Sequence, residues 1–354
     1  MQTMTHKSIL LCAMLLAFHA TAGADPGDQA DESASAEDAP VAKSAKSRQL
    51  CTKSKKLELV ARRLADLQYV PPSAELIHTA REAGVDANPV YAKFGVTGDF
   101  GSFKAWLENL NETADAPLIC GRARSGERVV LVAAVRAGSL MLAGKERLHA
   151  EVIEDFRDPY LVVRDSQGSS RRIAVDGEGF GATITLPVEW GRPLFVQLVA
   201  TGPNGPRPVA ERWVGKIPRG EPTQSASQSP ETWLMQLRRA AGARTLRSNR
   251  LLTREATSYA QKVCESGKLG HELDQSGDPE ARLLQRGIQA RVVGEAVARA
   301  ATMGEALHAI EDSPSHRMTV TDPRFTDAGY GKAKDDKGRT CIVVLLASWP
   351  RKVP

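Results

Sequence analysis

The histidines in the last third of the chain are the residues best suited to metal or acid–base chemistry. His271 opens the run His-Glu-Leu-Asp-Gln, which starts like the zinc-binding pattern H-E-x-x-H. The run ends in Gln275, where that pattern places its second histidine. The compact zinc motif, in which two histidines one helical turn apart share a metal ion, is therefore incomplete here.

A second histidine, His316, lies in the run Ser-Pro-Ser-His-Arg at 313–317. A hydroxyl beside an imidazole suggests a serine nucleophile, but adjacent residues seldom present Oγ to the neighbouring ring. The G-x-S-x-G turn, which exposes the serine of many hydrolases, occurs nowhere in the sequence. We therefore do not expect a catalytic triad built on Ser313 or Ser315.

His308 and Glu311 lie three residues apart, which places them on one face of a helix. They could contribute to a set of metal ligands. The alternative, which we favour, is an ordinary solvated helical face.

The N-terminus has the features of a secretory signal peptide. His6 and Lys7 precede an apolar run at 9–18, and small residues follow up to Ala24. The run is shorter than the roughly 20 residues that span a bilayer, and no later segment is longer and more apolar. Leu11 precedes Cys12, where a lipidated cysteine would need a small residue. We expect residues 1–24 to be removed near Ala24, leaving a soluble secreted or periplasmic chain with no transmembrane segment.

Four cysteines remain after this expected cleavage, and four cysteines allow three pairings. Two lie in the N-terminal half and two in the C-terminal half, so bridges that stay within one domain are Cys51–Cys120 and Cys264–Cys341. We predict these two disulfides, each contributing roughly 4 kcal/mol by the chain-entropy argument. Free buried thiols are the alternative, which an oxidising compartment disfavours.

Length and composition limit the classes of function. A chain of 354 residues is too long for one ordinary core, so two or three domains are expected. The net charge of +5 is mild for this length and aromatic residues make up 5% of the chain, so neither favours nucleic acid as a partner. Residues 25–47 carry few large apolar side chains and are expected to form a disordered linker.

The segment 48–125 has apolar residues at helical spacing, and we predict an α-helical N-terminal unit. One stripe precedes Pro71, a second follows Ser73 and stops near Gly84, and a third contains Trp106. Cys51 and Cys120 would join the two ends of this unit.

The segment 126–218 changes to short apolar runs separated by turn residues. About seven such runs, the first of them at 129–135, predict an antiparallel β-sandwich of immunoglobulin-like type. Histidine, cysteine and carboxylates do not cluster in it, so we interpret it as a structural or spacer domain.

After a second linker at 219–232, the segment 233–350 is predicted to form a mixed α/β domain. A helix should end at Ser266, a capping box at Thr302 and Glu305 should start another, and Ser313 should cap the turn that presents His316. The turn 335–338 should join two final strands. We expect Glu295 at the edge of a strand or in a turn.

The order of these features resembles the CAP superfamily, the SCP-like group that includes cysteine-rich secretory and pathogenesis-related proteins, in its short bacterial form. The features are a helix, His271, the pair Gly-Glu at 294–295, the run 313–317 and the run Gly-Tyr-Gly at 329–331. The resemblance covers about 233–350 and implies an α-β-α sandwich.

The resemblance also implies a cleft with two histidines and two acidic residues, which in some members bind a divalent cation. By position, the histidines are His271 and His316 and the first acid is Glu295. Ser313 stands where the longer forms have the second acid, so Glu311 or Asp312 would have to replace it. Two further departures are Ala296 in place of a usual Asn and Ile310 in place of a common Trp.

Two neutral imidazoles and one carboxylate would make a three-ligand set for zinc, with one position left for water. The alternative, which we favour, is a set of polar cleft residues hydrogen-bonded to one another and to water. Either reading requires the rings of His271 and His316 to lie within about 10 Å of each other, the reach of a water-bridged or metal-bridged pair.

These features support two hypotheses of function. The first is an exported binding or interaction module of the cell envelope or extracellular space that engages a ligand, a lipid or a partner protein. The second is a metal-dependent or His/Glu acid–base hydrolase acting on peptides or cell-wall material.

Overall fold

The computed structural model describes residues 49–144, 146–176, 181–218 and 229–350. The expected signal peptide, the first linker and most of the second linker lie outside these ranges. Within the described ranges, no helix combines the length and apolarity needed to cross a membrane.

The N-terminal part contains the three expected helices and also a sheet. The helices are α1 (Lys55–Ala65), α2 (Ser73–Glu82) and α3 (Phe100–Thr113). The sheet has the order β1-β3-β4-β2, formed by β1 (Thr52–Lys53), β2 (Val90–Val96), β3 (Leu118–Ser125) and β4 (Arg128–Val135). The predicted helical unit therefore also contains a sheet, which we did not predict.

The N-terminal sheet was not predicted because strand β4 was assigned to the wrong domain. Its apolar run suggested the first strand of the β-sandwich, but it pairs with β2 and β3 instead. Alternate residues of β4 face two separate cores: Val130 and Val132 pack with α1, whereas Val129 and Leu131 pack with α3. A strand covered on both faces has a continuous apolar run, which by itself does not reveal its neighbours.

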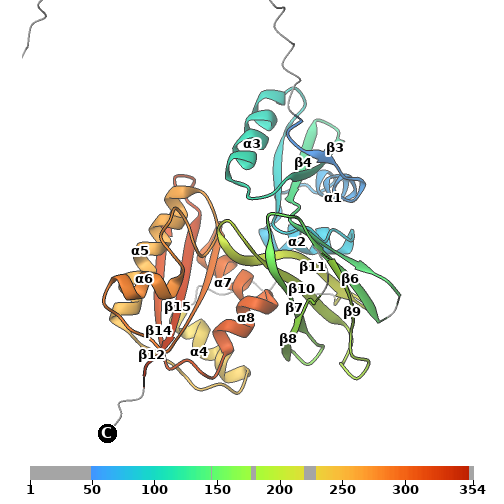
Figure 1. Ribbon diagram of the computed structural model, residues 1–354. Coiled ribbons are helices and arrows are strands. Elements are labelled where there is room, and N and C mark those ends of the chain that lie inside the picture. Colours follow the sequence, from blue (N-terminus) through green and yellow to red (C-terminus); the bar gives the residue numbers. More distant parts are fainter. Residues whose placement is uncertain (1–48, 145, 177–180, 219–228, 351–354) are drawn as a thin grey trace, which may run out of the picture. The chain divides into compact units, whose positions relative to one another are not determined.

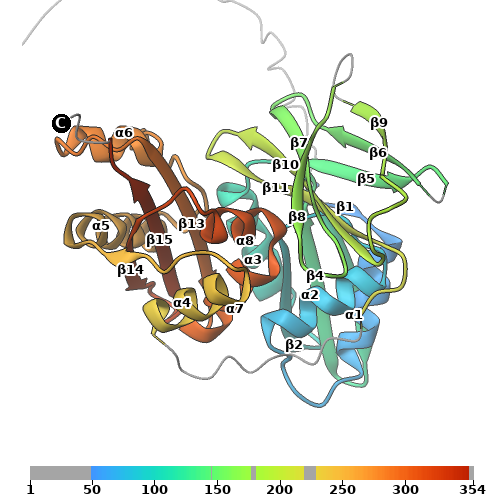
Figure 2. The same cartoon turned by 90° about the horizontal axis from the view of Figure 1, so that it is seen from below.

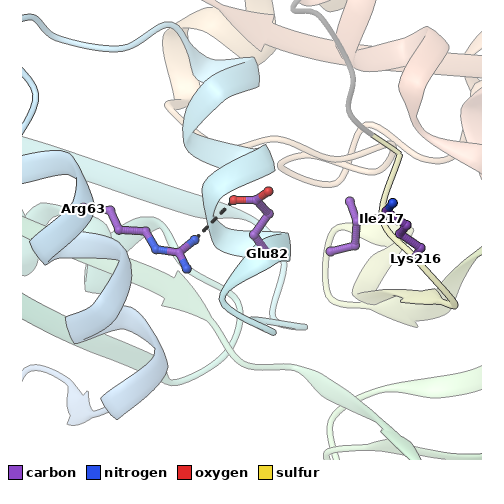
Figure 3. Close-up of a pocket in the computed structure, with 4 residues that line it drawn as sticks. All are labelled: Arg63, Glu82, Lys216 and Ile217. Atoms are coloured by element: carbon purple, nitrogen blue, oxygen red, sulfur yellow. Dashed lines mark hydrogen bonds and ion pairs between the residues drawn. The ribbon is translucent and has the colours of Figure 1, made fainter.

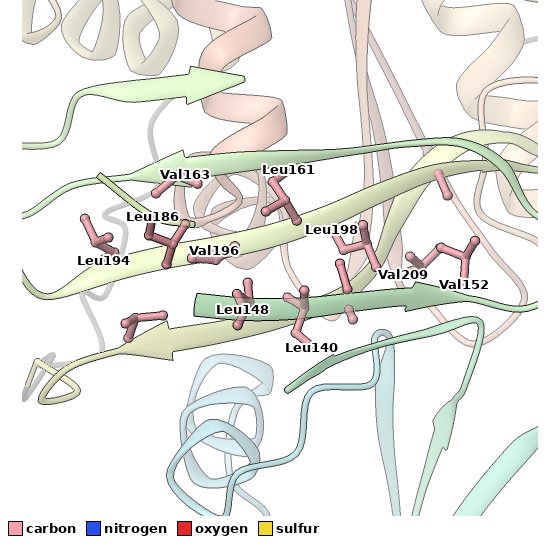
Figure 4. Packing of buried hydrophobic residues seen from close by; sticks show 14 of the residues in the cluster. Leu140, Leu148, Val152, Leu161, Val163, Leu186, Leu194, Val196, Leu198 and Val209 are labelled. Carbon is pink, nitrogen blue, oxygen red and sulfur yellow. The ribbon is translucent and has the colours of Figure 1, made fainter. Parts of the chain in front are cut away.

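Seven antiparallel strands follow, arranged as two sheets around one core. One sheet has the order β11-β10-β7-β8 and the other β5-β6-β9. The strands are β5 (Gly138–Leu142), β6 (Arg147–Val152), β7 (Arg157–Arg164), β8 (Ser170–Ala174), β9 (Gly181–Thr185), β10 (Leu194–Gly202) and β11 (Gly205–Val214). Figure 4 shows how side chains of both sheets meet, for example Leu140 and Leu148 against Leu161 and Val196.

The C-terminal part is a sheet with helices on both faces (Figures 1 and 2). The sheet order is β12-β14-β15-β13, formed by β12 (Arg247–Ser248), β13 (Val292–Ala300), β14 (Asp327–Lys334) and β15 (Thr340–Ser348). The helices are α4 (Pro230–Ala240), α5 (Arg250–Ser266), α6 (Pro279–Gln285), α7 (Met303–Asp312) and α8 (Pro314–Thr321).

Strand β15 separates the two cores of this three-layer arrangement. All nine of its residues are buried. Ile342 and Val344 face α4, α7 and α8, whereas Val343 and Leu345 face α5 and α6. The alternation follows from the two-residue period of a strand.

Both predicted disulfides are present. Cys51 is bonded to Cys120 and Cys264 to Cys341, each pair with Cα atoms 5.8 Å apart. The second bridge ties the last turn of α5 to the start of β15, beneath the core that these two elements share.

Two glycines of β14 face helix α5 and allow the two backbones to come into contact. A Cβ built on Gly331 would lie 2.0 Å from the carbonyl oxygen of Ala256, and one on Gly329 would lie 2.2 Å from the backbone of Leu252. These contacts involve backbone atoms, which cannot rotate away. The run Gly-Tyr-Gly therefore sets the separation between the helix and the sheet.

We predict that Gly331→Ala destabilises the protein by about 3 kcal/mol or more, because either the helix or the strand must shift to admit the methyl group. Urea unfolding of the oxidised protein measures the change. The matched control is Gly101→Ala in α3, where a Cβ meets nothing within 4 Å. This control should be neutral or stabilising by up to about 1 kcal/mol. Equal stability of the Gly331 variant and the wild type would contradict the argument.

Candidate functional site

His271 lies in a loop that α5 and the core hold in place. The helix ends at Gly267, which adopts a left-handed conformation with φ 66°. The hydroxyl of Tyr259 then bonds both sides of the histidine: it donates to the carbonyl oxygen of Gly270 at 3.0 Å and accepts from the amide of Leu273 at 3.2 Å. The position of His271 is therefore fixed by a buried side chain of the preceding helix.

Glu295 lies inside strand β13, not at a strand end or in a turn as we expected. Its side chain is 1% exposed. The prediction was wrong because the run 291–293 resembled a whole short strand, whereas the strand continues to Ala300. Alternation places Glu295 on the same face as Val297, which packs with α5 and α6.

His316 is presented by α8, as the Ser-Pro signal predicted. Ser313 caps the helix and Pro314 is its first residue. The ring centroids of His271 and His316 lie 6.2 Å apart with 56° between the planes. The two imidazoles are therefore within the distance that we required. They meet beside β13, the terminal strand of the sheet order, where residues from both helical layers can approach.

His271 and Glu295 are directly hydrogen-bonded. His271 Nδ1 lies 2.9 Å from Glu295 Oε1. A carboxylate only accepts hydrogen bonds, so the proton belongs on Nδ1. In the neutral ring, Nε2 is then the nitrogen that can accept a hydrogen bond. We call His271, Glu295 and His316 the histidine cluster.

Arg282 is a member of this site that the sequence analysis missed. Its side chain is 5% exposed, and it donates to Glu295 Oε2 through Nη2 and to Glu255 Oε1 through Nε at 3.0 Å. Nη1 donates to the carbonyl oxygens of His271 at 2.7 Å and Gly277 at 3.0 Å. The pair Asp278-Pro279 was the available signal, because a capping residue followed by proline indicates the start of a helix such as α6.

The second buried carboxylate near the cluster is Glu255 of α5. Its two oxygens accept hydrogen bonds from Arg282 and Arg286, and its side chain is 4% exposed. Two carboxylates and two guanidinium groups are therefore paired at this site. The neutral overall charge allows the charged groups to be buried.

The two residues that we considered as replacements for the second acid are hydrogen-bonded to residues outside the histidine cluster. Glu311 accepts hydrogen bonds from the Trp233 indole at 3.2 Å and from Arg317 at 3.4 Å. Asp312 bonds to Arg81 at 2.6 Å and to Arg164 at 3.4 Å. Neither has a hydrogen bond to His271, His316 or Glu295 among the described contacts.

Nearby positive charges favour the ionised form of the Asp312 carboxyl. Burial opposes ionisation of its carboxyl, but attraction and hydrogen bonds from Arg81, followed by attraction from Arg164 and His308, hold its pKa below the usual range. His308 of α7 therefore lies near Asp312.

Ser313 and Ser315 point toward β10. Both hydroxyls donate to Gln197 Oε1, at 3.1 and 2.7 Å respectively. The amides of His271 and Glu272 donate to the carbonyl oxygen of Asn204 in the turn between β10 and β11, at 2.9 and 3.1 Å. Residues of β10 and of the turn that follows it therefore contact His271 and the serines before His316.

Zinc binding by His271, His316 and Glu295 was the reading that we did not favour. Within the described ranges, no group of three or more His, Cys, Asp or Glu side chains is arranged to hold a metal ion. Glu295 has one oxygen bonded to His271 and the other to Arg282. A zinc ion bound to that carboxylate would lie close to the positive charge of Arg282.

A separate surface pocket has no part in this site. It is lined by Arg63, Glu82, Lys216 and Ile217 (Figure 3), and Arg63 pairs with Glu82 at 3.2 Å. No candidate residue from the sequence analysis lines it.

Comparison with known families identifies part of the chain. Residues 234–346 match the CAP profile, which is described as the Cysteine-rich secretory protein family. No curated protein matches the chain in sequence.

Several solved structures are similar to parts of the chain. An outer surface protein from Borrelia burgdorferi is 21% identical, with 34% of this chain and 90% of that chain covered and a TM-score of 0.32. An extracellular protein with an SCP domain from Bacillus anthracis is 16% identical, with 60% and 67% covered and a TM-score of 0.30. A cysteine-rich secretory protein from Staphylococcus aureus is 11% identical, with 77% and 92% covered and a TM-score of 0.26.

Burial, and then the nearby His271, lower the pKa of His316 from 6.5 to about 3. In the unfolded chain the ring gains its proton near pH 6.5, whereas in the folded protein it stays neutral. The stability that depends on the neutral ring is thus complete above pH 6.5 and is lost as the pH falls toward 3. The slope is about 1.4 kcal/mol per pH unit.

We predict that lowering the pH from 6.5 to 4.5 costs the wild type about 2 kcal/mol more unfolding free energy than it costs His316→Gln. Urea unfolding at the two pH values measures the difference. His149→Gln on β6, outside the site, is the control and should follow the wild type. Parallel behaviour of His316→Gln and the wild type would show that the ring accepts a proton in the folded protein.

Proposed function

We propose that this chain, whose residues 234–346 are a CAP-superfamily domain, is an exported binding or interaction protein of the cell envelope or extracellular space. In this proposal the histidine cluster contacts the ligand. The observation that carries it is the placement of two imidazoles 6.2 Å apart beside the terminal strand β13. The His271 side chain is 14% exposed, which allows a ligand to reach it.

The chemistry of the cluster favours an uncharged polar ligand. With its Nδ1 proton directed at Glu295, His271 can accept a hydrogen bond at Nε2. A neutral His316 offers one donor and one acceptor. The charge of Glu295 is already matched by Arg282, so the site has no unpaired charge to attract an ion. Saccharide hydroxyls and peptide amides, the polar groups of bacterial cell walls, fit this pattern.

A second candidate is a hydrolase that acts on the same material. The observation that favours it is the His271–Glu295 hydrogen bond, because a carboxylate that orients an imidazole is the usual support of a general base. The hydroxyls of Ser313 and Ser315 are bonded to Gln197, so water would be the nucleophile. His271 Nε2 would then take the proton from that water.

We propose export on two grounds. The first is the signal-like sequence at 1–24, which lies outside the described residues. The second is the pair of disulfides, because such bonds form and persist in oxidising compartments.

We also propose that β5–β11 are an immunoglobulin-like spacer. The order β5-β6-β9 facing β8-β7-β10-β11 supports this assignment. With strands lettered A to G, it is the sheet pair ABE and DCFG. It differs from the constant-type pair ABED and CFG only in the sheet that the fourth strand joins.

The binding proposal predicts that the mature oxidised protein co-sediments with purified peptidoglycan sacculi. The double variant His271→Ala, His316→Ala should bind at least tenfold more weakly, equal to about 1.4 kcal/mol. His149→Ala is the matched control and should bind as the wild type does. The supernatant is assayed for soluble muropeptides in the same experiment.

Each outcome has a defined meaning. Binding without release, weakened only in the double variant, supports the binding function. Release of muropeptides that His271→Ala abolishes supports the hydrolase instead. Absence of binding and release, or binding that the double variant retains, overturns the assignment of the histidine cluster to a cell-wall ligand.

A further inference from the structure

Arg282 lies between two buried carboxylates next to the imidazole rings, those of Glu255 and Glu295. Figure 1 shows α6, the helix that carries it, beside the sheet and close to α5. The guanidinium contacts one carboxylate from α5, one from β13 and the carbonyl oxygen of His271. Its Cζ atom lies 3.5 Å from the centre of the Tyr259 ring, which adds a cation–π contact.

We infer that the Arg282 guanidinium supplies the positive charge of this site. It pairs with both Glu255 and Glu295 and thereby excludes a divalent metal ion from the histidine cluster. The inference concerns the same side chains as the proposed function but requires no ligand. A result that contradicts the inference therefore does not contradict the proposed function, and the reverse also holds.

The exclusion follows from charge, because a metal ion on Glu295 would lie against the Arg282 guanidinium, which carries a charge of the same sign. Glu295 Oε2 is bonded to Arg282, and Oε1 is bonded to Nδ1 of His271. The two nitrogens left for a metal are Nε2 of His271 and one nitrogen of His316. A protein zinc site generally has three or four protein ligands, so two imidazoles alone are too few.

Removal of the guanidinium should remove this repulsion. Glu255 and Glu295 would lose the positive charge between them, and the Glu295 carboxylate could then bind a metal ion without repulsion from Arg282. A divalent cation could then restore the charge balance, with Glu295 and an imidazole as its first ligands. One substitution would thus convert a site that excludes a metal ion into a site that binds one.

The test is zinc titration of the mature, oxidised protein by calorimetry, with ring ¹⁵N NMR of the histidines as a second readout. The wild type should bind zinc no more tightly than His271→Ala does, and its His271 ring should keep the proton on Nδ1. Arg282→Met, which retains much of the chain length without the charge, should bind one zinc ion at least about tenfold more tightly than the wild type.

Arg286→Met is the matched control. Arg286 also bonds to Glu255, but it has no bond to Glu295 among the described contacts and its side chain is 40% exposed. It should leave zinc affinity unchanged. The triple variant Arg282→Met, Glu295→Gln, His271→Ala should lose the zinc affinity gained by Arg282→Met.

Several results would overturn the inference. Stoichiometric zinc in the wild type, lost in Glu295→Gln, shows that Arg282 does not exclude the metal. A folded Arg282→Met variant that gains no zinc affinity shows that the guanidinium is not what blocks it. If Arg282→Met does not fold, the wild-type titration and the Nδ1 proton assignment decide alone: tight zinc binding or a proton on Nε2 overturns the inference.

Discussion

The histidine cluster depends on a guanidinium buried between two carboxylates. Charges removed from water are tolerated only when each is paired and its hydrogen-bonding groups are satisfied. Arg282 meets this condition through Glu255, Glu295 and two backbone carbonyl oxygens. Its contacts fix α5, α6, β13 and the His271 loop relative to one another, and the direction of the His271 ring follows from the position of Glu295.

The surroundings of the cluster extend beyond the segment that matches the CAP family. Gln197 of β10 accepts hydrogen bonds from two serines beside His316, and Asn204 accepts from the amide of His271. Arg81 of α2 joins Glu211 of β11 to Asp312 of α7. Buried polar contacts of this kind are costly to leave half-made, so the 49–218 region contributes to the shape and polarity of the site.

Local signals made much of the C-terminal domain predictable. The capping residues Thr302 and Ser313, the glycine after α5 and the final hairpin each depend on a few neighbouring residues, and the structure has all of them. The pairing of strands was harder to predict. The run at β4 gave no indication that it joins the N-terminal sheet, because a strand buried on both faces has no polar alternation to orient it.

The sequence by itself determined two helices of the last domain, α5 and α7, the capped turn before His316 and the pairing of the four cysteines, and the resemblance to the CAP family named His271, Glu295 and His316 as candidates. These conclusions depend on short-range capping, on the distribution of cysteines between two halves and on the order of motifs along the chain. The tertiary structure alone showed that Arg282 joins Glu255 to Glu295 and that Glu311 and Asp312 are hydrogen-bonded to other residues. Charge pairing in a protein interior is set by which side chains the folded backbone brings within hydrogen-bonding distance, and sequence spacing does not encode that distance.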